Sequence, residues 1–395
     1  GSFTTRKPET VSVEFTVEQR ALHDDLLALI ARIMERRHGN ANLQFLLTTI
    51  RRQAASCIFG LAPMLEAILS RHLSALELSE AGDEATPDQI GDELADFRGE
   101  IEALIQRSRN LSRVDPKLEA LRQVVHDKQK LPNNKLLLFS TFRHTLAYLL
   151  DSLAVEGIRI GLIHGDIAED ERRVLRNRFG LARENPEAID LLMSSEVGCE
   201  GLDYQFCDGL VNYDLPWNPM RVEQRIGRID RYGQRSETVA VYNFVTPGTV
   251  DADIYERCLL RIGVFREALG GSEEILGRLT REIRDVAENL TLTAEERVAR
   301  LQQLADNEVR AVQEQARLED EQSKLFGIAV PSRSFEDMVR EASSYWLTPS
   351  MLANLVANYL EALAGGKEVP GIRDKKIATL RLAREVREAL LTDFR

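Results

Sequence analysis

Short apolar runs rich in branched residues recur through the middle of the chain. Turn-forming residues bound these runs, which cover residues 135–140, 158–164, 189–194, 209–214 and 239–245. The segments between them carry apolar residues at helical spacing, as at Leu146, Leu149 and Leu153, with a charged opposite face. This alternation predicts an α/β fold with a parallel sheet and crossover helices. In such a fold we expect ligands at the carboxyl ends of the strands.

Helical patterns flank this block on both sides. Residues 17–76 are mostly helical in pattern, and after Ile275 apolar residues step by three and four, at Leu276, Leu279, Ile283, Val286 and Leu290. Thr293 and Glu296 have the spacing of a capping box, which predicts a second helix that folds back on the first. We therefore expect a lead-in over 1–20, a mostly helical segment over 21–130 with an acidic linker at 77–100, an α/β lobe over 131–270 and a helical C-terminal extension over 271–395. The helical segment either precedes the lobe or is inserted in it, and the opening Gly1-Ser2 is typical of the remnant of a cleaved purification tag.

Composition narrows the class of protein. The 395 residues include 63 acidic and 51 basic side chains, a net charge of -12, which argues against binding nucleic acid through overall charge and leaves room for a local basic cleft. No apolar run approaches the roughly 18 residues needed to span a bilayer, so we expect no membrane partner. The four cysteines form no C-x-x-C pair and the six histidines are scattered. We therefore predict no metal site and a reducing cytoplasm.

A row of arginines is the strongest local signal. Steps of four, three, three and four separate Arg221, Arg225, Arg228, Arg231 and Arg235. This spacing predicts one face of a helix that begins near Pro219 and ends near Gly233. Guanidinium groups held in a rigid row match phosphate oxygens and suit a phosphoryl-transfer transition state. The alternative is a solvated helix face paired with neighbours such as Glu223 and Asp230, and the spacing leaves both interpretations open.

A glycine-containing loop follows the third predicted strand. Within residues 194–206, Gly198 and Gly201 would let a ligand approach the backbone closely. Asp203 could accept a hydrogen bond from a ribose hydroxyl. Loops of this kind are common after strands, so alone this one is only a weak indication of a nucleotide site.

Five segments in order resemble the motifs of a known family. They are LLLFSTF at 136–142, HGD at 164–166, SSEVGCEGLDYQF at 194–206, DLPWNP at 214–219 and QRIGRIDRYGQ at 224–234. The series resembles motifs IV to VI of superfamily 2 helicases, and more narrowly the second, RecA-like lobe of Swi/Snf-related ATPases, with wording similar to bacterial RapA-type members. The resemblance extends over residues 5–270. Cys199 and Asp203 depart from it, since the family usually has glycine and asparagine there.

The resemblance implies roles for individual residues. Arg228 and Arg231 would act as arginine fingers on the γ-phosphate of ATP, and Gln224, Gly198, Gly201 and Asp203 would line the nucleotide cleft. The expected contacts with the DNA backbone are Ser140, Thr141, Phe142, His164, Gly165, Asp166, Ser194 and Ser195. The sequence contains no GxxxxGK[ST] loop, so the resemblance places the phosphate-binding lysine and the Mg²⁺ ligands on a separate first lobe.

These observations together predict the C-terminal half of a DNA-stimulated ATPase. Its expected partners are the N-terminal ATPase lobe of the same protein and duplex DNA, in a cytoplasm of prokaryotic type, with ATP and Mg²⁺ as cofactors. We expect the fragment alone to be inactive. One alternative is a non-catalytic RecA-like module that docks on RNA polymerase or on proteins of a phage-defence complex. Another is an RNA-directed or strand-separating helicase of the same superfamily.

Overall fold

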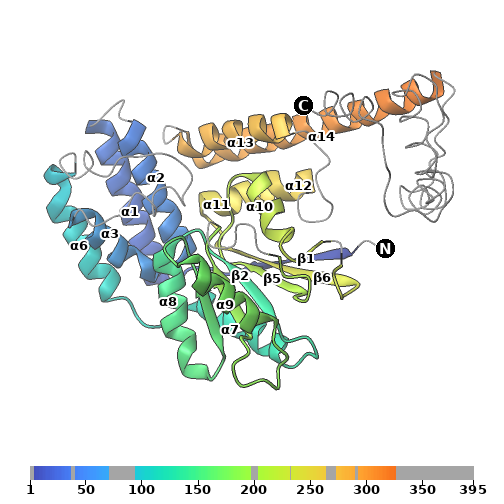
Figure 1. Ribbon diagram of the computed structural model, residues 1–395. Coiled ribbons are helices and arrows are strands. Elements are labelled where there is room, and N and C mark those ends of the chain that lie inside the picture. Colours follow the sequence, from blue (N-terminus) through green and yellow to red (C-terminus); the bar gives the residue numbers. More distant parts are fainter. Residues whose placement is uncertain are drawn as a thin grey trace, which may run out of the picture. The chain divides into compact units, whose positions relative to one another are not determined.

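The computed structural model describes residues 4–36, 41–70, 94–196, 203–231, 233–263, 273–289 and 292–325 (Figure 1). Residues 1–314 form one compact unit and residues 315–395 a second. None of the helices in the described ranges is long and apolar enough to cross a membrane.

Six parallel strands form a single sheet in the order β1-β6-β5-β2-β4-β3. Five of them confirm the predicted runs, namely β2 (Leu136–Phe139), β3 (Ile160–Ile163), β4 (Leu191–Ser194), β5 (Gly209–Asn212) and β6 (Thr238–Val245). The sixth, β1 (Thr5–Ser12), lies in the predicted lead-in and pairs with β6 along its whole length. It is a polar edge strand, where Lys7 and Pro8 are tolerated because one side of the strand needs no partner. Its sequence therefore lacks the apolar signal of the inner strands.

Both faces of the sheet are covered, as the apolar strands predict. Leu137 and Phe139 of β2 point into one core, and Leu136 and Leu138 point into the other. The second core is closed by α7 (Pro116–Gln129) and α8 (Arg143–Leu153). The first is closed by α9 (Glu169–Gly180), α10 (Pro219–Ile226) and α11 (Val250–Ile254), which a π-helical turn (Tyr255–Leu259) and α12 (Leu260–Ile262) follow. Although α7 belongs to the predicted helical segment 21–130, it packs on the sheet.

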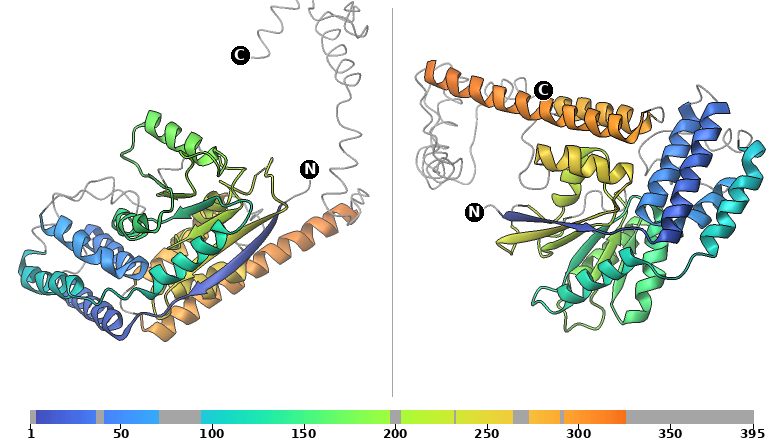
Figure 2. Two further views of the ribbon diagram at one scale, coloured as in Figure 1. Left: turned by 90° about the horizontal axis from the view of Figure 1, so that it is seen from below. Right: turned by 180° about the vertical axis from the view of Figure 1, so that it is seen from behind.

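A separate helical subdomain stands beside the sheet (Figures 1 and 2). It comprises α1 (Val17–Arg36), α2 (Ala41–Ser56), a short 3-10 turn (Ile58–Gly60), α3 (Leu61–Leu69) and α6 (Arg98–Arg109). Their apolar faces share a core of their own, which confirms the helical pattern. Of the predicted acidic linker, residues 77–93 lie outside the described residues. The remainder is not an exposed connection, because a 3-10 turn (Ala95–Phe97) and the start of α6 bury Phe97 in that core.

The predicted stripe of the C-terminal extension packs on the lobe. Leu279, Ile283 and Val286 of α13 (Glu273–Glu288) are buried in the same core as α10 and α11, whereas the side chain of Leu276 and residue Leu290 lie outside the described set. The capping box is confirmed, since the Thr293 N–H donates to Glu296 Oε2 at 2.9 Å and the Glu296 N–H to Thr293 Oγ1 at 3.2 Å. The helix that it opens, α14 (Ala294–Leu325), turns back along α13 (Figure 2).

His23 makes the helical subdomain sensitive to acid. Its ring on α1 is 2% exposed, and burial, helped by the Arg20 charge, lowers its pKa from 6.5 to about 4. As the pH falls, the unfolded chain therefore binds this proton before the folded chain does. The free energy of unfolding keeps its full value above about pH 6.5 and decreases by on the order of 3 kcal/mol as the pH drops towards 4. We expect urea unfolding of His23→Gln to lose this part of the pH dependence, while the same change at exposed His126 keeps it. Equal pH slopes in all three proteins would contradict the expectation.

Candidate functional site

The loops that follow four strands meet at the carboxyl edge of the sheet, as expected. They comprise residues 140–142, 164–166, 194–196 and 214–218. Backbone bonds join them: the Ser140 N–H donates to the Ser194 carbonyl at 3.2 Å, and the Ser195 N–H to the Ile163 carbonyl at 3.1 Å. The edge therefore brings together all three segments that the resemblance assigns to DNA contact.

Most of these expected DNA-contacting side chains point inward. Ser140, Thr141, Phe142, Ser194 and Ser195 are buried. The Ser140 hydroxyl donates to the Asp214 carboxylate, the Thr141 N–H donates to Asp214 Oδ1 at 2.8 Å, and the Ser194 hydroxyl donates to the Ser195 carbonyl at 2.8 Å. In this arrangement the hydroxyls hold the loops in shape.

Among the described residues of these loops, those after β3 are the most accessible. His164 and Gly165 are half-buried, and the exposed Asp166 forms an ion pair with Arg143 at the start of α8. That ion pair holds the pKa of the Asp166 carboxyl below its ordinary value. A phosphate approaching this loop would meet a guanidinium already oriented by a carboxylate.

The predicted arginine helix is shorter than its spacing indicates. Asn218 caps α10 by accepting from the Met220 N–H at 2.8 Å, but the helix ends at Ile226 rather than near Gly233. Beyond it the chain continues in tight turns, in which the Arg228 carbonyl accepts from the Tyr204 N–H at 2.8 Å and the Gln234 amide donates to the Ile229 carbonyl at 2.7 Å. These tertiary bonds replace helical ones, so the prediction of five arginines on one helix face is wrong. Beside the arginines, the apolar side chains of Val222, Ile226 and Ile229 are fully buried.

The arginines of this segment have separate environments. Arg225 is 2% exposed and bonds within the carboxyl edge. Glu223 and Asp230, which the alternative interpretation pairs with the row, both bind Arg6 of β1, at 3.1 Å from its Nη1 and 2.6 Å from its Nε. The N-terminal strand thus anchors this segment to the sheet.

The expected nucleotide-facing residues lie at the surface. Gln224 is exposed and Arg228 is half-buried. Arg231, with its side chain 52% exposed, forms an ion pair with Asp203, which precedes the Tyr204 that bonds to Arg228. Gly198, Cys199 and Gly201 lie outside the described residues. The described residues also hold no group of three or more His, Cys, Asp or Glu side chains placed to bind a metal.

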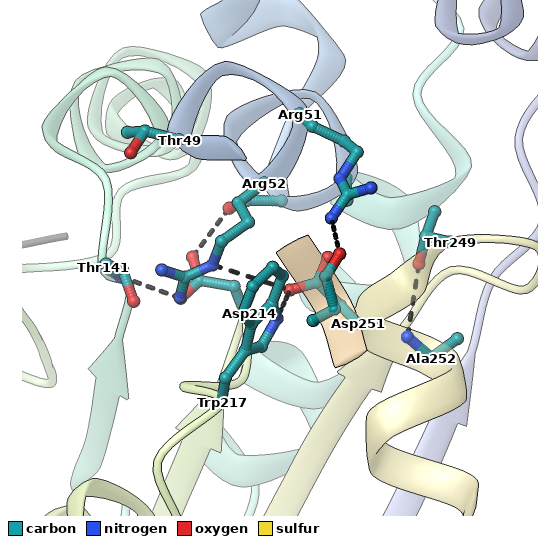
Figure 3. A network of polar contacts seen from close by, with 12 residues as sticks. Thr49, Arg51, Arg52, Thr141, Asp214, Trp217, Thr249, Asp251 and Ala252 are labelled. Carbon is teal, nitrogen blue, oxygen red and sulfur yellow. Dashed lines mark hydrogen bonds and ion pairs between the residues drawn. The ribbon is translucent and has the colours of Figure 1, made fainter. Parts of the chain in front are cut away.

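Trp217 lies in a buried polar cluster that joins the helical subdomain, the α/β lobe and helix α13 (Figure 3). Its indole N–H donates to Asp251 Oδ1 at 2.9 Å, and the Arg52 guanidinium of α2 lies 4.8 Å from its ring centroid. Arg51 reaches across to donate to the Ala287 carbonyl of α13. Burial raises the pKa of the Asp251 carboxyl, although the Arg52 charge and the Trp217 bond oppose this. The sequence gives no sign of this cluster, because its members lie far apart along the chain.

Comparison with known proteins identifies relatives of this chain. Residues 116–233 match the model of the helicase conserved C-terminal domain; this stretch begins at α7 and ends between Arg231 and Arg235. The chain is 31% identical over 274 residues to the uncharacterized ATP-dependent helicase YqhH of Bacillus subtilis, covering 69% of this chain and 43% of the relative. It is 42% identical over 82 residues to the RNA polymerase-associated protein RapA of Proteus mirabilis, covering 21% of this chain and 8% of that protein.

Among solved structures, the chain is similar to the C-terminal part of the Fun30 ATPase domain, with a TM-score of 0.43, 16% identity, and coverage of 72% of this chain and 99% of that one. The chain spans less than half the length of the curated relatives named above. The motif order, the parallel sheet and the family match agree. Residues 116–233 therefore match a helicase C-terminal domain, and the chain is similar to Swi/Snf-type helicases of superfamily 2.

Proposed function

We propose that this chain is the C-terminal half of an ATP-dependent, DNA-stimulated translocase of the Swi/Snf type. ATP would bind between two lobes, with a first lobe outside these 395 residues supplying the phosphate-binding lysine and the Mg²⁺ ligands. The lobe described here would supply Arg228 and Arg231 to the γ-phosphate. In the Bacillus relative, which is named as an ATP-dependent helicase, more than half of the chain lies beyond the matched region.

The proposal rests mainly on the different positions of the arginines. The guanidinium of Arg225 is buried and bonded inside the protein, whereas Arg228 and Arg231 reach the surface in turns anchored to the Asp203–Tyr204 loop. A γ-phosphoryl group transferred to water develops charge that such guanidinium groups stabilise. Since these arginines need a nucleotide held by another lobe, the chain alone should not turn over ATP.

DNA would run along the carboxyl edge of the sheet. The loop at His164 to Asp166, with Arg143, offers the accessible contacts, while Ser140, Thr141 and Ser194 shape the edge from within. Contacts to the sugar-phosphate backbone position a protein without reading sequence. Closure of the two lobes on ATP and their opening after hydrolysis would then move the protein along the duplex.

The choice of nucleic acid tests this proposal against its alternatives. ATP hydrolysis by the full-length protein is measured with duplex DNA, single-stranded DNA and RNA of equal length. We expect duplex DNA to stimulate most. A preference for RNA would favour the RNA-directed helicase, and no stimulation by any of the three would favour the docking module.

A further inference from the structure

A buried guanidinium, that of Arg225, joins the loops of the carboxyl edge. Its Nη1 donates to the Asp214 carbonyl at 2.6 Å and to Asn212 Oδ1 at 3.2 Å. Its Nη2 donates to Thr141 Oγ1 at 3.2 Å, and its Nε donates to Glu196 Oε1 at 3.1 Å. The side chain is 1% exposed and also lies over the ring of Phe139, 5.4 Å from its centroid. All three nitrogens are thus used inside the protein.

The partners of Arg225 come from three separate loops. Thr141 follows β2, Glu196 follows β4, and Asn212 and Asp214 lie at the end of β5. The Asp214 carboxylate extends the set, because its Oδ2 also accepts from the Ser56 hydroxyl at the end of α2, at 2.7 Å. One side chain therefore contacts three of the four loops described above, all but the one after β3, and it is linked to the helical subdomain through a single further residue.

Arg225 also belongs to the last turn of α10, three residues before Arg228. The Arg228 N–H donates to the Arg225 carbonyl at 3.2 Å, so the two residues share a backbone bond. The fork of a guanidinium has fixed geometry, and a buried arginine that loses a partner leaves a costly unpaired donor. A shift of the loop at 140–142 or 194–196 therefore cannot leave α10 and the turn after it unaffected.

We propose that Arg225 is a positioning residue that couples the loops after β2, β4 and β5 at the carboxyl edge to Arg228. The inference rests on the proposed function and adds the route by which DNA would change ATP turnover. DNA held at the carboxyl edge would favour one arrangement of the loops, and the bonds of Arg225 would carry that preference to the turn that bears Arg228. No direct contact of Arg225 with ATP or DNA is needed.

The test uses Arg225→Lys and Glu196→Gln in the full-length protein. Lysine keeps the charge but cannot bond three loops at once, and Glu196→Gln weakens the bonds from Nε and Nη2 of Arg225 while leaving the guanidinium in place. Arg221→Lys, at a half-buried position one turn earlier in the same helix, is the matched control. ATP hydrolysis is measured over a range of duplex DNA and ATP concentrations, with thermal unfolding alongside. We expect the ratio of stimulated to basal turnover to fall about tenfold or more in both variants and to stay unchanged in the control.

A purely structural role predicts something different. It would lower the unfolding temperature and reduce basal and stimulated turnover in proportion, so an unchanged ratio in both variants would overturn the inference. If Arg225→Lys does not fold, Glu196→Gln decides the question by the same ratio. Absence of stimulation in the unaltered protein would overturn the proposed function and this inference together, whereas stimulation that persists in both variants would overturn the inference alone.

Discussion

Replacing Arg228 by alanine in the full-length protein is expected to lower ATP turnover about a thousandfold or more and to leave duplex DNA binding close to normal. An arginine finger stabilises charge that exists only in the transition state, so its loss lowers kcat. The side chain is half-buried at the end of a turn, and the backbone bond from Tyr204 does not depend on it. Truncation should therefore remove the guanidinium without moving the loop.

Arg235→Ala provides the control for this substitution. Arg235 belongs to the same series of arginines and is exposed, and its N–H bonds to the Gln205 carbonyl at 3.2 Å. Steady-state hydrolysis and a DNA-binding titration on both variants separate turnover from binding. Near-normal turnover in Arg228→Ala would remove Arg228 from the catalytic machinery.

Asp214→Ala is expected to destabilise the folded chain by about 3 to 5 kcal/mol. The carboxylate is buried 3.5 Å from Arg225 Nη2, and it accepts bonds from Ser56, Ser140 and the Thr141 N–H. Burial alone would raise its pKa, but the Arg225 charge and these donors hold the pKa below its ordinary value. Without the carboxylate the buried guanidinium loses one of its two carboxylate neighbours, and three donors lose an acceptor.

Urea unfolding near neutral pH measures this loss, with Asp170→Ala as the control because its ion pair with Arg173 is exposed. We expect a large drop in the unfolding midpoint for Asp214→Ala and a midpoint near that of the unaltered protein for the control. The depressed pKa adds a second readout: the stabilisation by Asp214 is present above the pKa of an unfolded aspartate, about 4, and is lost as the pH falls further. Equal midpoints in the two variants would show that the buried network contributes little.

The strands β2, β4 and β5 could be predicted from the sequence because each of them is buried on both faces. That burial demands continuous apolar residues, and residues 135–140 and 189–194 show them directly. β1 could not be found in this way, since an edge strand with alternating exposed side chains needs only a partner for its backbone. The capping box of α14 could also be predicted, because both of its hydrogen bonds join residues close in the sequence.

The sequence identified segments that meet at the carboxyl edge, but not how their side chains lie there. Family motifs identify the segments, but equal spacing cannot separate buried Arg225 from surface Arg231. Tertiary hydrogen bonds make the difference. Bonds from Tyr204 and Gln234 hold the chain in turns after Ile226, so the later arginines do not lie on the helix face that Arg225 occupies. The cluster around Trp217 depends likewise on Arg52 and Asp251, which lie far from it along the chain.

The central claim is that this lobe belongs to a DNA-stimulated ATPase motor. The most direct test is the rate of ATP hydrolysis by the full-length protein with and without saturating duplex DNA, with the 395-residue chain assayed in parallel. We predict hydrolysis by the full-length protein that rises clearly when duplex DNA is added, and none by the 395-residue chain under either condition. Full-length protein that hydrolyses no ATP, or hydrolyses it at a rate that duplex DNA leaves unchanged, would contradict the account.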